Sequence, residues 1–326
     1  MLKIGVLGAG HLGKIHLKCI QLAAETYQLA GFYDPNAQAA RQVSESLGIP
    51  CFDSAEALIA AVDVVDIVTP TTQHYALAEK AILAGKHLFI EKPLTHTVAE
   101  AESLVSLSRK HGVQVQVGHV ERFNPALLAL EDMPLHPMFI EAHRLAAFNP
   151  RGTDVSVILD LMIHDIDIIL SMVRSPVKSV SASGVAVVSE TPDIANARIE
   201  FENGCVANLT ASRISLKQMR KVRFFQKDAY VSLDFLEKQA QVVRLYEKGA
   251  SNLPQEANLL ELSTPSGEKL LHIHMPEIEQ VNAIRMELEA FAHSIENKTT
   301  PKVSIEDGYE ALKVAYRIVE EIEKRV

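Results

Sequence analysis

Cysteine is scarce in this sequence of 326 residues: only Cys19, Cys51 and Cys205 occur, far apart and without a CxxC spacing. Such a pattern favours a reducing compartment over a disulfide framework. Apolar runs of the roughly 18 residues that span a membrane are also lacking. The first apolar run is short and leads into glycines, unlike a signal peptide. We therefore expect a soluble, cytoplasmic protein without a membrane partner.

An excess of positive charge is absent as well. The formal net charge is -9 and the isoelectric point is about 5.8, which argues against a surface that neutralises nucleic-acid phosphates. Hydrophobic residues make up 48% and charged residues 22% of the chain, as in ordinary globular proteins. At roughly 150 residues per domain, the length predicts two domains.

Signatures of metal sites and covalent nucleophiles are missing. His272 and His274 alternate on a probable strand and share a face, but no third ligand is evident in the sequence. A GxSxG motif and a cysteine-histidine signature are also lacking. We therefore expect no metal site and interpret the two histidines as ordinary strand residues.

A glycine-rich loop follows a short apolar strand, Leu2 to Leu7, and opens an amphipathic helix that continues to about Ala24. This is GxGxxG in the strand-loop-helix context of a dinucleotide site. Its glycines permit a tight turn, close approach to a pyrophosphate and packing of helix on strand, and the helix N-terminus attracts phosphate. The predicted cofactor-binding residues of this loop are Gly8, Ala9, Gly10, His11, Leu12 and Gly13.

Asp34 ends the second predicted strand, Leu29 to Tyr33, at the interval after Gly13 that is typical of a ribose-binding acid. Its carboxylate should accept hydrogen bonds from the adenosine ribose hydroxyls and repel a 2′-phosphate. We therefore expect NAD to be preferred over NADP. The alternative is that Asp34-Pro35-Asn36 is only a turn.

Strands and helices continue to alternate to about residue 117, which predicts a parallel, doubly wound Rossmann sheet. Polar residues follow two of its buried strands, Val64 to Val68 and His87 to Ile90. The carboxyl ends of parallel strands share one edge of the sheet, where ligands bind. A helix-start role for His74 and a solvated Glu-Lys turn are the alternatives. The further predicted cofactor-binding residues are Thr69, Pro70, Thr71, His74, Glu91 and Lys92.

From Gly118 onward the pattern changes to extended runs separated by turns. Residues Ala195 to Phe201 alternate between apolar and polar, and Asn203-Gly204 supplies a two-residue hairpin turn. We expect a fold of class α/β plus α+β, with a Rossmann domain at 1–120 and an open-faced antiparallel sheet in a substrate domain at 121–326. The free face of such a sheet often becomes a subunit interface, which predicts a homodimer or homotetramer.

One helix of the second half, Asp160 to Val173, is apolar almost all round and should be largely buried. It nevertheless carries Asp160 and His164, which are i,i+4 neighbours on one face. Buried charges are costly unless they are paired or functional. The two residues are either a helix cap and a core histidine, or a functional pair.

Together these motifs resemble the Gfo/Idh/MocA family of NAD(P)-dependent sugar and cyclitol oxidoreductases. The resemblance covers essentially the whole chain and rests on GxGxxG followed by His16, the acid Asp34, T-P-x-x-x-H, E-K-P and D-x-x-x-H-D-x-D. It implies that Lys92, Asp160 and His164 are catalytic and act without a metal. Met162 stands where the family usually has glycine, and its side chain is expected to narrow the pocket.

The resemblance implies hydride transfer between a secondary alcohol of a sugar and the nicotinamide. His164 would move the hydroxyl proton, Asp160 would orient the imidazole, and Lys92 would stabilise charge on the oxygen. Lys92 and His164 come from different predicted domains and should converge across a cleft. The alternatives are a free-sugar or inositol dehydrogenase, a biliverdin-reductase-like enzyme and a non-catalytic NAD-binding regulator.

The segment Gly118 to Pro125 resembles the interdomain segment of family members that act on nucleotide sugars. It implies a UDP-linked amino sugar oxidised at the 3-position. A diphosphate needs cationic or bidentate donors. The candidate substrate-binding residues are Arg122, Arg144 and Arg151.

Overall fold

The computed structural model describes residues 1–149, 155–250, 253, 259–265 and 267–324. They form two compact units, which we describe separately. Unit 1 comprises Met1–Phe123 and Asn282–Val314, and unit 2 comprises Asn124–Val281 and Ala315–Val326. The domain boundary expected at residue 120 lies close to the first junction. The sequence pattern assigns residues 282–314 to the second domain, whereas in the structure they pack with the first.

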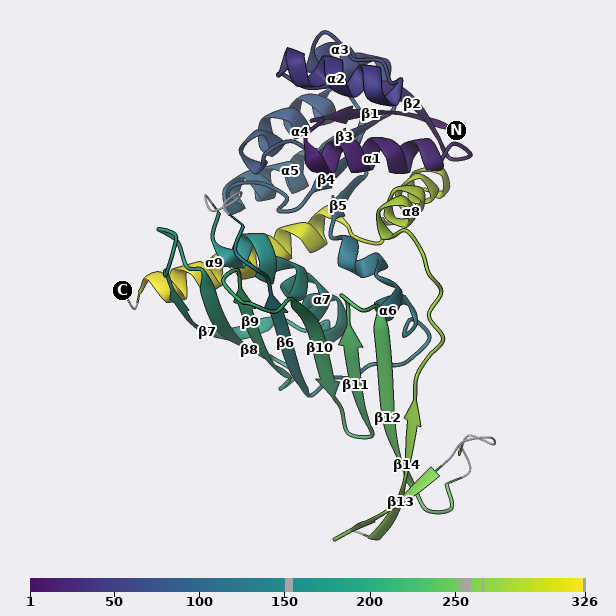
Figure 1. The fold of residues 1–326 in the computed structure, drawn as a ribbon, viewed down its shortest axis with the longest axis vertical. Helices are drawn as coiled ribbons and strands as arrows, with labels where there is room; N and C mark the ends of the chain where they lie inside the picture. Colours follow the sequence, from purple (N-terminus) through teal and green to yellow (C-terminus); the bar gives the residue numbers. More distant parts are fainter. Residues whose placement is uncertain (150–154, 251–252, 254–258, 266, 325–326) are drawn as a thin grey trace. The chain divides into compact units, whose positions relative to one another are not determined.

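Unit 1 contains a parallel sheet with the strand order β2-β1-β3-β4-β5 in the part of the chain that is described (Figure 1). This confirms the predicted doubly wound sheet. The order reverses between β1 and β3, the place where open parallel sheets bind ligands. The elements are β1 Leu2–Leu7, α1 His11–Leu22, β2 Tyr27–Tyr33, α2 Ala37–Leu47, α3 Ala55–Ala61, β3 Val64–Ile67, η1 Thr71–Gln73, α4 His74–Leu83, β4 His87–Glu91, α5 Val98–His111, β5 Val115–Gly118, η2 Val120–Phe123 and α8 Ala283–Asn297.

Helices α1, α2 and α8 build the core on one face of this sheet. Leu17, Val43 and Leu288, one from each helix, share a cluster with Ile4 and Phe89 of the strands. Helix α8 is distant in sequence, and its buried face brings it into this cluster, where it packs against α1 and β4. A division of the chain at residue 120 would place this helix in the second domain instead.

Unit 2 contains a sheet with the order β13-β14-β12-β11-β10-β6-β9-β8-β7, counted over its described residues. All neighbouring pairs are antiparallel except β6 with β9, so the expected large, mostly antiparallel sheet is confirmed. The elements are α6 Pro125–Leu128, β6 Phe139–Leu145, η3 Ile158–Met162, α7 Ile163–Val173, β7 Val177–Val185, β8 Ile194–Phe201, β9 Val206–Ser212, β10 Met219–Phe225, β11 Ala229–Asp234, β12 Gln239–Glu247, β13 Leu259–Thr264 and β14 Gly267–His274. Helix α9, Ile305–Glu323, contributes residues to both units.

The predicted helix from Asp160 to Val173 is divided in the structure. Residues Ile158–Met162 form a π-helix, and a regular α-helix, α7, follows from Ile163 to Val173. Short π segments within α-helices occur frequently at functional sites. Asp160 therefore lies in the irregular turn and His164 in the first regular one.

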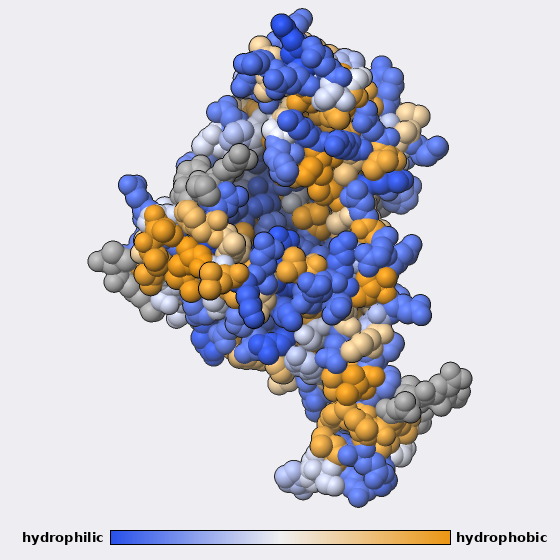
Figure 2. Space-filling view, in the orientation of Figure 1, coloured by the Kyte–Doolittle hydropathy of each residue, from blue (hydrophilic) through white to orange (hydrophobic). Residues whose placement is uncertain are grey.

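Burial alternates along the unit 2 strands, so one face of the sheet is covered and the other is open. The open face carries an aromatic row across adjacent strands, because Phe225 of β10 is in register with both Phe139 and Tyr230. Figure 2 shows hydrophobic surface near the β13–β14 hairpin, where Leu260 and Ile273 are exposed. Self-association through this face stays a prediction. No helix among the described residues is long and apolar enough to cross a membrane.

Candidate active site

The glycine loop after β1 lies on the ends of the two neighbouring strands. Gly8 has a left-handed backbone with φ of 98°, and its N–H donates to the Tyr33 carbonyl oxygen at 2.9 Å. A Cβ atom on Gly8 would lie 2.7 Å from the Val68 carbonyl oxygen, and one on Gly13 would lie 2.1 Å from the Gly8 carbonyl oxygen. A side chain is therefore excluded at Gly8 by the left-handed backbone and by backbone contact, and at Gly13 by backbone contact.

Gly10 has a different role from these two glycines. It caps helix α1 without a side-chain hydrogen bond, so the first-turn N–H groups have no side-chain cap. A Cβ atom there would project into open space, with no heavy atom within 4 Å. Ala9 and Gly13 are buried, whereas Gly10, His11 and Leu12 are exposed. The helix end thus has donors and room for an anionic group such as a pyrophosphate.

Asp34 binds the loop to the end of β2. Its Oδ2 atom accepts a hydrogen bond from the Ala9 N–H at 2.8 Å, and its Oδ1 atom accepts one from the Asn36 N–H at 2.9 Å. The side chain is half-buried. Asp34 therefore shapes the glycine loop directly, a function that the ribose-binding interpretation does not include.

His74 is 1% exposed, and both of its ring nitrogens face backbone carbonyl oxygens. Nδ1 lies 3.0 Å from the Pro93 oxygen and Nε2 lies 2.9 Å from the Thr69 oxygen. Burial lowers the pKa of His74, so the neutral ring donates its single proton to one of the two. The predicted cofactor contact at His74 is thus corrected: the side chain connects the turn after β3 to the turn after β4.

The turn after β3 offers a different group to a ligand. The Thr69 hydroxyl oxygen is buried and has no hydrogen-bond partner among the described residues. Thr71 is half-buried and Pro70 is exposed. An orphaned hydroxyl at the carboxyl end of a parallel strand fits a bound polar ligand, because buried polar groups rarely stay unpaired.

Glu91 does not face a ligand either, because its carboxylate takes part in a buried network. Oε1 lies 3.1 Å from His16 Nε2, and Oε2 accepts the Lys92 N–H at 3.1 Å. His16 Nδ1 lies 2.9 Å from Asp66 Oδ2. The predicted cofactor contact at Glu91 is therefore corrected. Lys92 follows at a half-buried position, and the Lys92-Pro93 peptide bond is cis.

The charge state of His16 follows from its surroundings. Burial alone would lower the pKa of His16, but the carboxylates of Asp66 and Glu91 raise it well above its ordinary value. For Glu91, burial acts to raise the pKa, yet the contacts with His16 and Lys92 lower it on balance. The pair is an imidazolium and a carboxylate, with both ring N–H groups donating.

Glu287 of α8 is a fourth buried charged residue in this region. It is 0% exposed, and neither carboxylate oxygen has a hydrogen-bond partner among the described residues. Burial, and then the Glu91 carboxylate, raise the pKa of Glu287 well above its usual value. A protonated, neutral Glu287 avoids the cost of another uncompensated buried charge.

In unit 2, Asp160 and His164 stay half-buried while the intervening Met162 and Ile163 are fully buried. The two polar residues are thus on the accessible side of an otherwise buried helix. Met162 has no exposed surface, so its side chain packs in the core of unit 2. The expected narrowing of a pocket at Met162 stays a prediction.

Arg144 is not a phosphate reader, which corrects its predicted role. Its Nε atom donates to Asp165 Oδ2 at 3.0 Å and a terminal nitrogen donates to Oδ1 at 2.8 Å. Both side chains are 3% exposed. The guanidinium is therefore committed to a buried bidentate pair and has little surface for a substrate.

The other two predicted arginines differ from Arg144. The Arg122 guanidinium lies 3.9 Å from Asp307 Oδ1, and its side chain is 11% exposed. This contact is longer than a direct hydrogen bond. Arg151 lies outside the residues that the structure describes.

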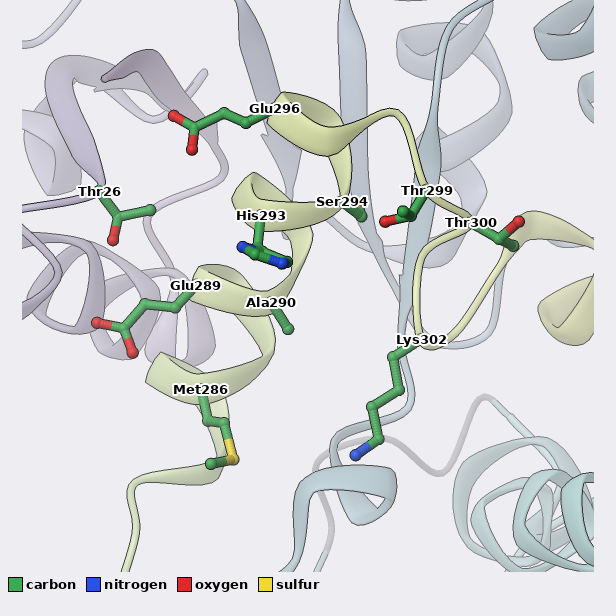
Figure 3. Close-up of a pocket in the computed structure, with 10 residues that line it drawn as sticks. All are labelled: Thr26, Met286, Glu289, Ala290, His293, Ser294, Glu296, Thr299, Thr300 and Lys302. Carbon is green, nitrogen blue, oxygen red and sulfur yellow. The ribbon is translucent and has the colours of Figure 1, made fainter.

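A surface pocket of about 590 Å³ in unit 1 is separate from these groups (Figure 3). Helix α8 lines it with Glu289, His293 and Glu296, and Lys302 extends toward it from the following segment. It contains none of the predicted site residues. Across the described ranges, no three histidine, cysteine or acidic side chains are grouped so that they could hold a metal ion.

Sequence reasoning misses three members of the buried network in unit 1 as functional candidates: His16, Asp66 and Glu287. Asp66 is a charged residue inside the apolar strand β3, and Glu287 lies on the buried face of α8 between Ile284 and Leu288. A charge on an apolar face is the signal that could find them. Which of these residues contact one another, however, is known only from the fold.

Comparisons with known proteins identify the family to which the chain belongs. Residues 2–119 match the model of the Gfo/Idh/MocA oxidoreductase family with an NAD-binding Rossmann fold, and residues 139–228 match a C-terminal domain model of the same family. A UDP-N-acetylglucosamine 3-dehydrogenase from Acidithiobacillus ferrooxidans is 42% identical over 254 residues, covering 78% of this chain and 79% of that protein. The chain belongs to the Gfo/Idh/MocA family. It is an NAD-dependent oxidoreductase, as predicted.

Two further similarities add to this comparison. A solved structure of the UDP-N-acetylglucosamine 3-dehydrogenase from Acidithiobacillus ferrooxidans has a TM-score of 0.88 and 34% identity, and the match covers 99% of this chain and 98% of that one. The scyllo-inositol 2-dehydrogenase (NAD+) of Bacillus subtilis is 30% identical over 231 residues, covering 65% of this chain and 68% of that protein.

Replacing Glu287 by glutamine should stabilise the protein increasingly as the pH rises. The folded-state pKa is raised, so above about pH 4.3 the unfolded chain loses the Glu287 proton while the folded chain keeps it. Wild-type stability is therefore lost with rising pH, by about 1.4 kcal/mol per pH unit between the two pKa values, and the amide escapes this loss.

Thermal midpoints of wild type and Glu287→Gln between about pH 5 and pH 8 measure this effect. Glu296→Gln, at an exposed glutamate of the same helix, is the control and should show no such trend. A wild-type-to-variant difference that stays constant over this range would mean that Glu287 is ionised in the folded protein.

NADH should bind more tightly than NADPH, by roughly tenfold or more, because the Asp34 carboxylate opposes a 2′-phosphate. Asp34→Asn should reduce this preference. The amide oxygen can still accept the Ala9 N–H, so the loop is retained while the charge is removed. Fluorescence titration with both cofactors measures the ratio, with Asp53→Asn at an exposed position as the control. Equal affinities in the wild type would rule out this role of Asp34.

Proposed function

We propose that the chain is a nucleotide-sugar dehydrogenase that oxidises the 3-hydroxyl of UDP-N-acetylglucosamine, or of a similar UDP-linked amino sugar, with NAD. The observation that carries this proposal is the 42% identity to the Acidithiobacillus ferrooxidans enzyme across 78% of the chain. A match of that extent is longer than either unit, so it includes parts of both. The retained Lys92, Asp160 and His164 favour an enzyme over a non-catalytic regulator.

The residues that would hold NAD are those of the loop and the adjoining strand ends. We assign the diphosphate to the N–H groups at the start of α1, where Gly10 leaves open space. Asp34 would take the adenosine ribose, and the orphaned Thr69 hydroxyl would take a polar group of the cofactor. Bound NAD supplies the hydride acceptor at its nicotinamide ring.

The chemical step would use three side chains, Lys92, Asp160 and His164. As the carbon that bears the hydroxyl gives up its hydride, His164 accepts the hydroxyl proton, and the product is a ketone. Asp160 orients the imidazole and stabilises its protonated form. Lys92, with its backbone fixed by the Glu91 carboxylate, stabilises negative charge that develops on the oxygen.

The second candidate is an inositol or free-sugar dehydrogenase, favoured by the 30% identity to the scyllo-inositol 2-dehydrogenase. A panel of UDP-sugars, free sugars and inositols with NAD, followed by absorbance of the reduced nicotinamide, separates the candidates. We also propose that the aromatic row on the open sheet face joins two or more copies of the chain, which sedimentation equilibrium would reveal.

His164→Ala should lower kcat by roughly 10²- to 10⁴-fold while NAD affinity stays nearly constant, because proton transfer is lost and the nucleotide loop is untouched. Lys92→Met should have a similar effect. Initial rates at saturating NAD measure both, and His136→Ala, at an exposed histidine of unit 2, is the control. Near-normal turnover in a folded His164→Ala or Lys92→Met protein would show that the substituted residue is structural.

With NADH bound, UDP-N-acetylglucosamine should bind at least about tenfold more tightly than N-acetylglucosamine, and its affinity should fall with rising salt. Arg122→Met should remove part of that difference, because it removes the positive charge that the proposed substrate role assigns to Arg122. Isothermal titration measures both ligands, and Arg109→Met is a matched control because Arg109 also pairs with an acid of α9. Equal binding of the two ligands would contradict the proposed substrate class but not the family.

A further inference from the structure

The buried pair Arg144–Asp165 connects the helix that carries His164 to the middle of the unit 2 sheet. Arg144 lies on β6, which is paired along its whole length with β10 on one side and β9 on the other. Asp165 lies in the first turn of α7, next to His164. The two hydrogen bonds measure 3.0 and 2.8 Å and involve both carboxylate oxygens. A bidentate fork of this kind restricts rotation as well as distance.

The backbone before this turn departs from regular α-helical geometry. Residues Ile158–Met162 form a π-helix, with wider turns and a hydrogen-bond pattern that differs from that of the following α-helix. Asp160 lies inside that segment and His164 just after it. A small rotation or shift of α7 would therefore change the relation between the two side chains.

Stability alone does not account for the pair. A buried ion pair often contributes no more than well-packed apolar side chains of similar volume, since desolvation offsets the attraction. Arg144 and Asp165 are each 3% exposed, so their desolvation is nearly complete. An apolar pair would not fix the orientation of the first turn of α7 relative to β6. The bidentate contact does so at Asp165, and His164 is the adjacent residue.

We propose that Arg144 and Asp165 are positioning residues, which hold the first turn of α7 on β6 so that His164 has the orientation that proton transfer requires. This inference rests on the proposed function, in which His164 is the proton acceptor. Neither residue needs to touch the substrate. Their effect on the reaction passes through the rotation and the axial position of α7.

The double variant Arg144→Met/Asp165→Leu separates positioning from stability, because it leaves no unpaired charge in the core. Its thermal midpoint should stay close to that of the wild type, while kcat for UDP-N-acetylglucosamine falls roughly tenfold or more. The KM for NAD should change less than about twofold, because the glycine loop belongs to unit 1. Arg144→Lys keeps the charge but loses the fork, and kcat should fall to an intermediate value.

Arg223→Gln/Glu141→Gln is a matched control. That pair joins β10 to β6, with a 2.9 Å contact, and both of its side chains are partly exposed and lie away from α7. It should leave kcat nearly unchanged. A folded Arg144→Met/Asp165→Leu protein with wild-type kcat would overturn the proposal. If that double variant does not fold, wild-type kcat in folded Arg144→Lys would overturn it equally.

A second measurement does not depend on turnover. The imidazole resonances of His164 in the NADH-bound protein should shift or broaden in Arg144→Lys and in the apolar double variant, while those of His136 stay constant. Unchanged His164 resonances in both variants would overturn the positioning role. Lack of turnover in the wild type, together with altered His164 resonances in the variants, would instead disprove the proposed function and leave the structural coupling standing.

Discussion

The interaction on which unit 1 depends is the placement of the His16 imidazole between the carboxylates of Asp66 and Glu91. Both ring nitrogens face carboxylate oxygens inside the core, so only the protonated ring satisfies both partners. The three residues come from α1, β3 and β4. Helix α1 carries the glycine loop, and Glu91 accepts the N–H of Lys92. One cation thus fixes helix α1, which follows the glycine loop, relative to the strand that presents the lysine.

The cost of burying charged groups in this network explains why Glu287 is protonated. The region contains three carboxyl groups and one imidazole, and a low-dielectric core does not tolerate two uncompensated negative charges. Burial raises the pKa of both Asp66 and Glu287, but Asp66 is bound to His16. Glu287 has no hydrogen-bond partner among the described residues, so it is the group that stays neutral. Glu287 is therefore protonated because the single imidazolium, His16, binds Glu91 and Asp66 instead.

Much of this fold follows from the sequence, because its periodicities are local. The parallel sheet, the β8–β9 hairpin and the half-buried strands of unit 2 depend on neighbours in the chain, and all are present. The hairpin loop is Glu202-Asn203-Gly204, however, one residue longer than the predicted two-residue turn. The association of α8 with unit 1 does not follow, since a helix shows which face it buries but not which sheet covers it. The conversion of Ile158–Met162 to a π-helix likewise has no signature in hydrophobic spacing.

The errors at individual site residues have one physical cause. His74, Glu91 and Arg144 are polar residues beside the predicted site, and the sequence pattern treats each as facing a ligand. In the structure each is buried against a partner distant in sequence: the Pro93 carbonyl, His16 and Asp165. A polar residue near a site has two ways to avoid the cost of desolvation, by binding a ligand or by binding the protein, and the sequence does not distinguish them. The residues that remain candidates are those whose polar atoms stay accessible or orphaned, as the Thr69 hydroxyl and the half-buried Lys92 do.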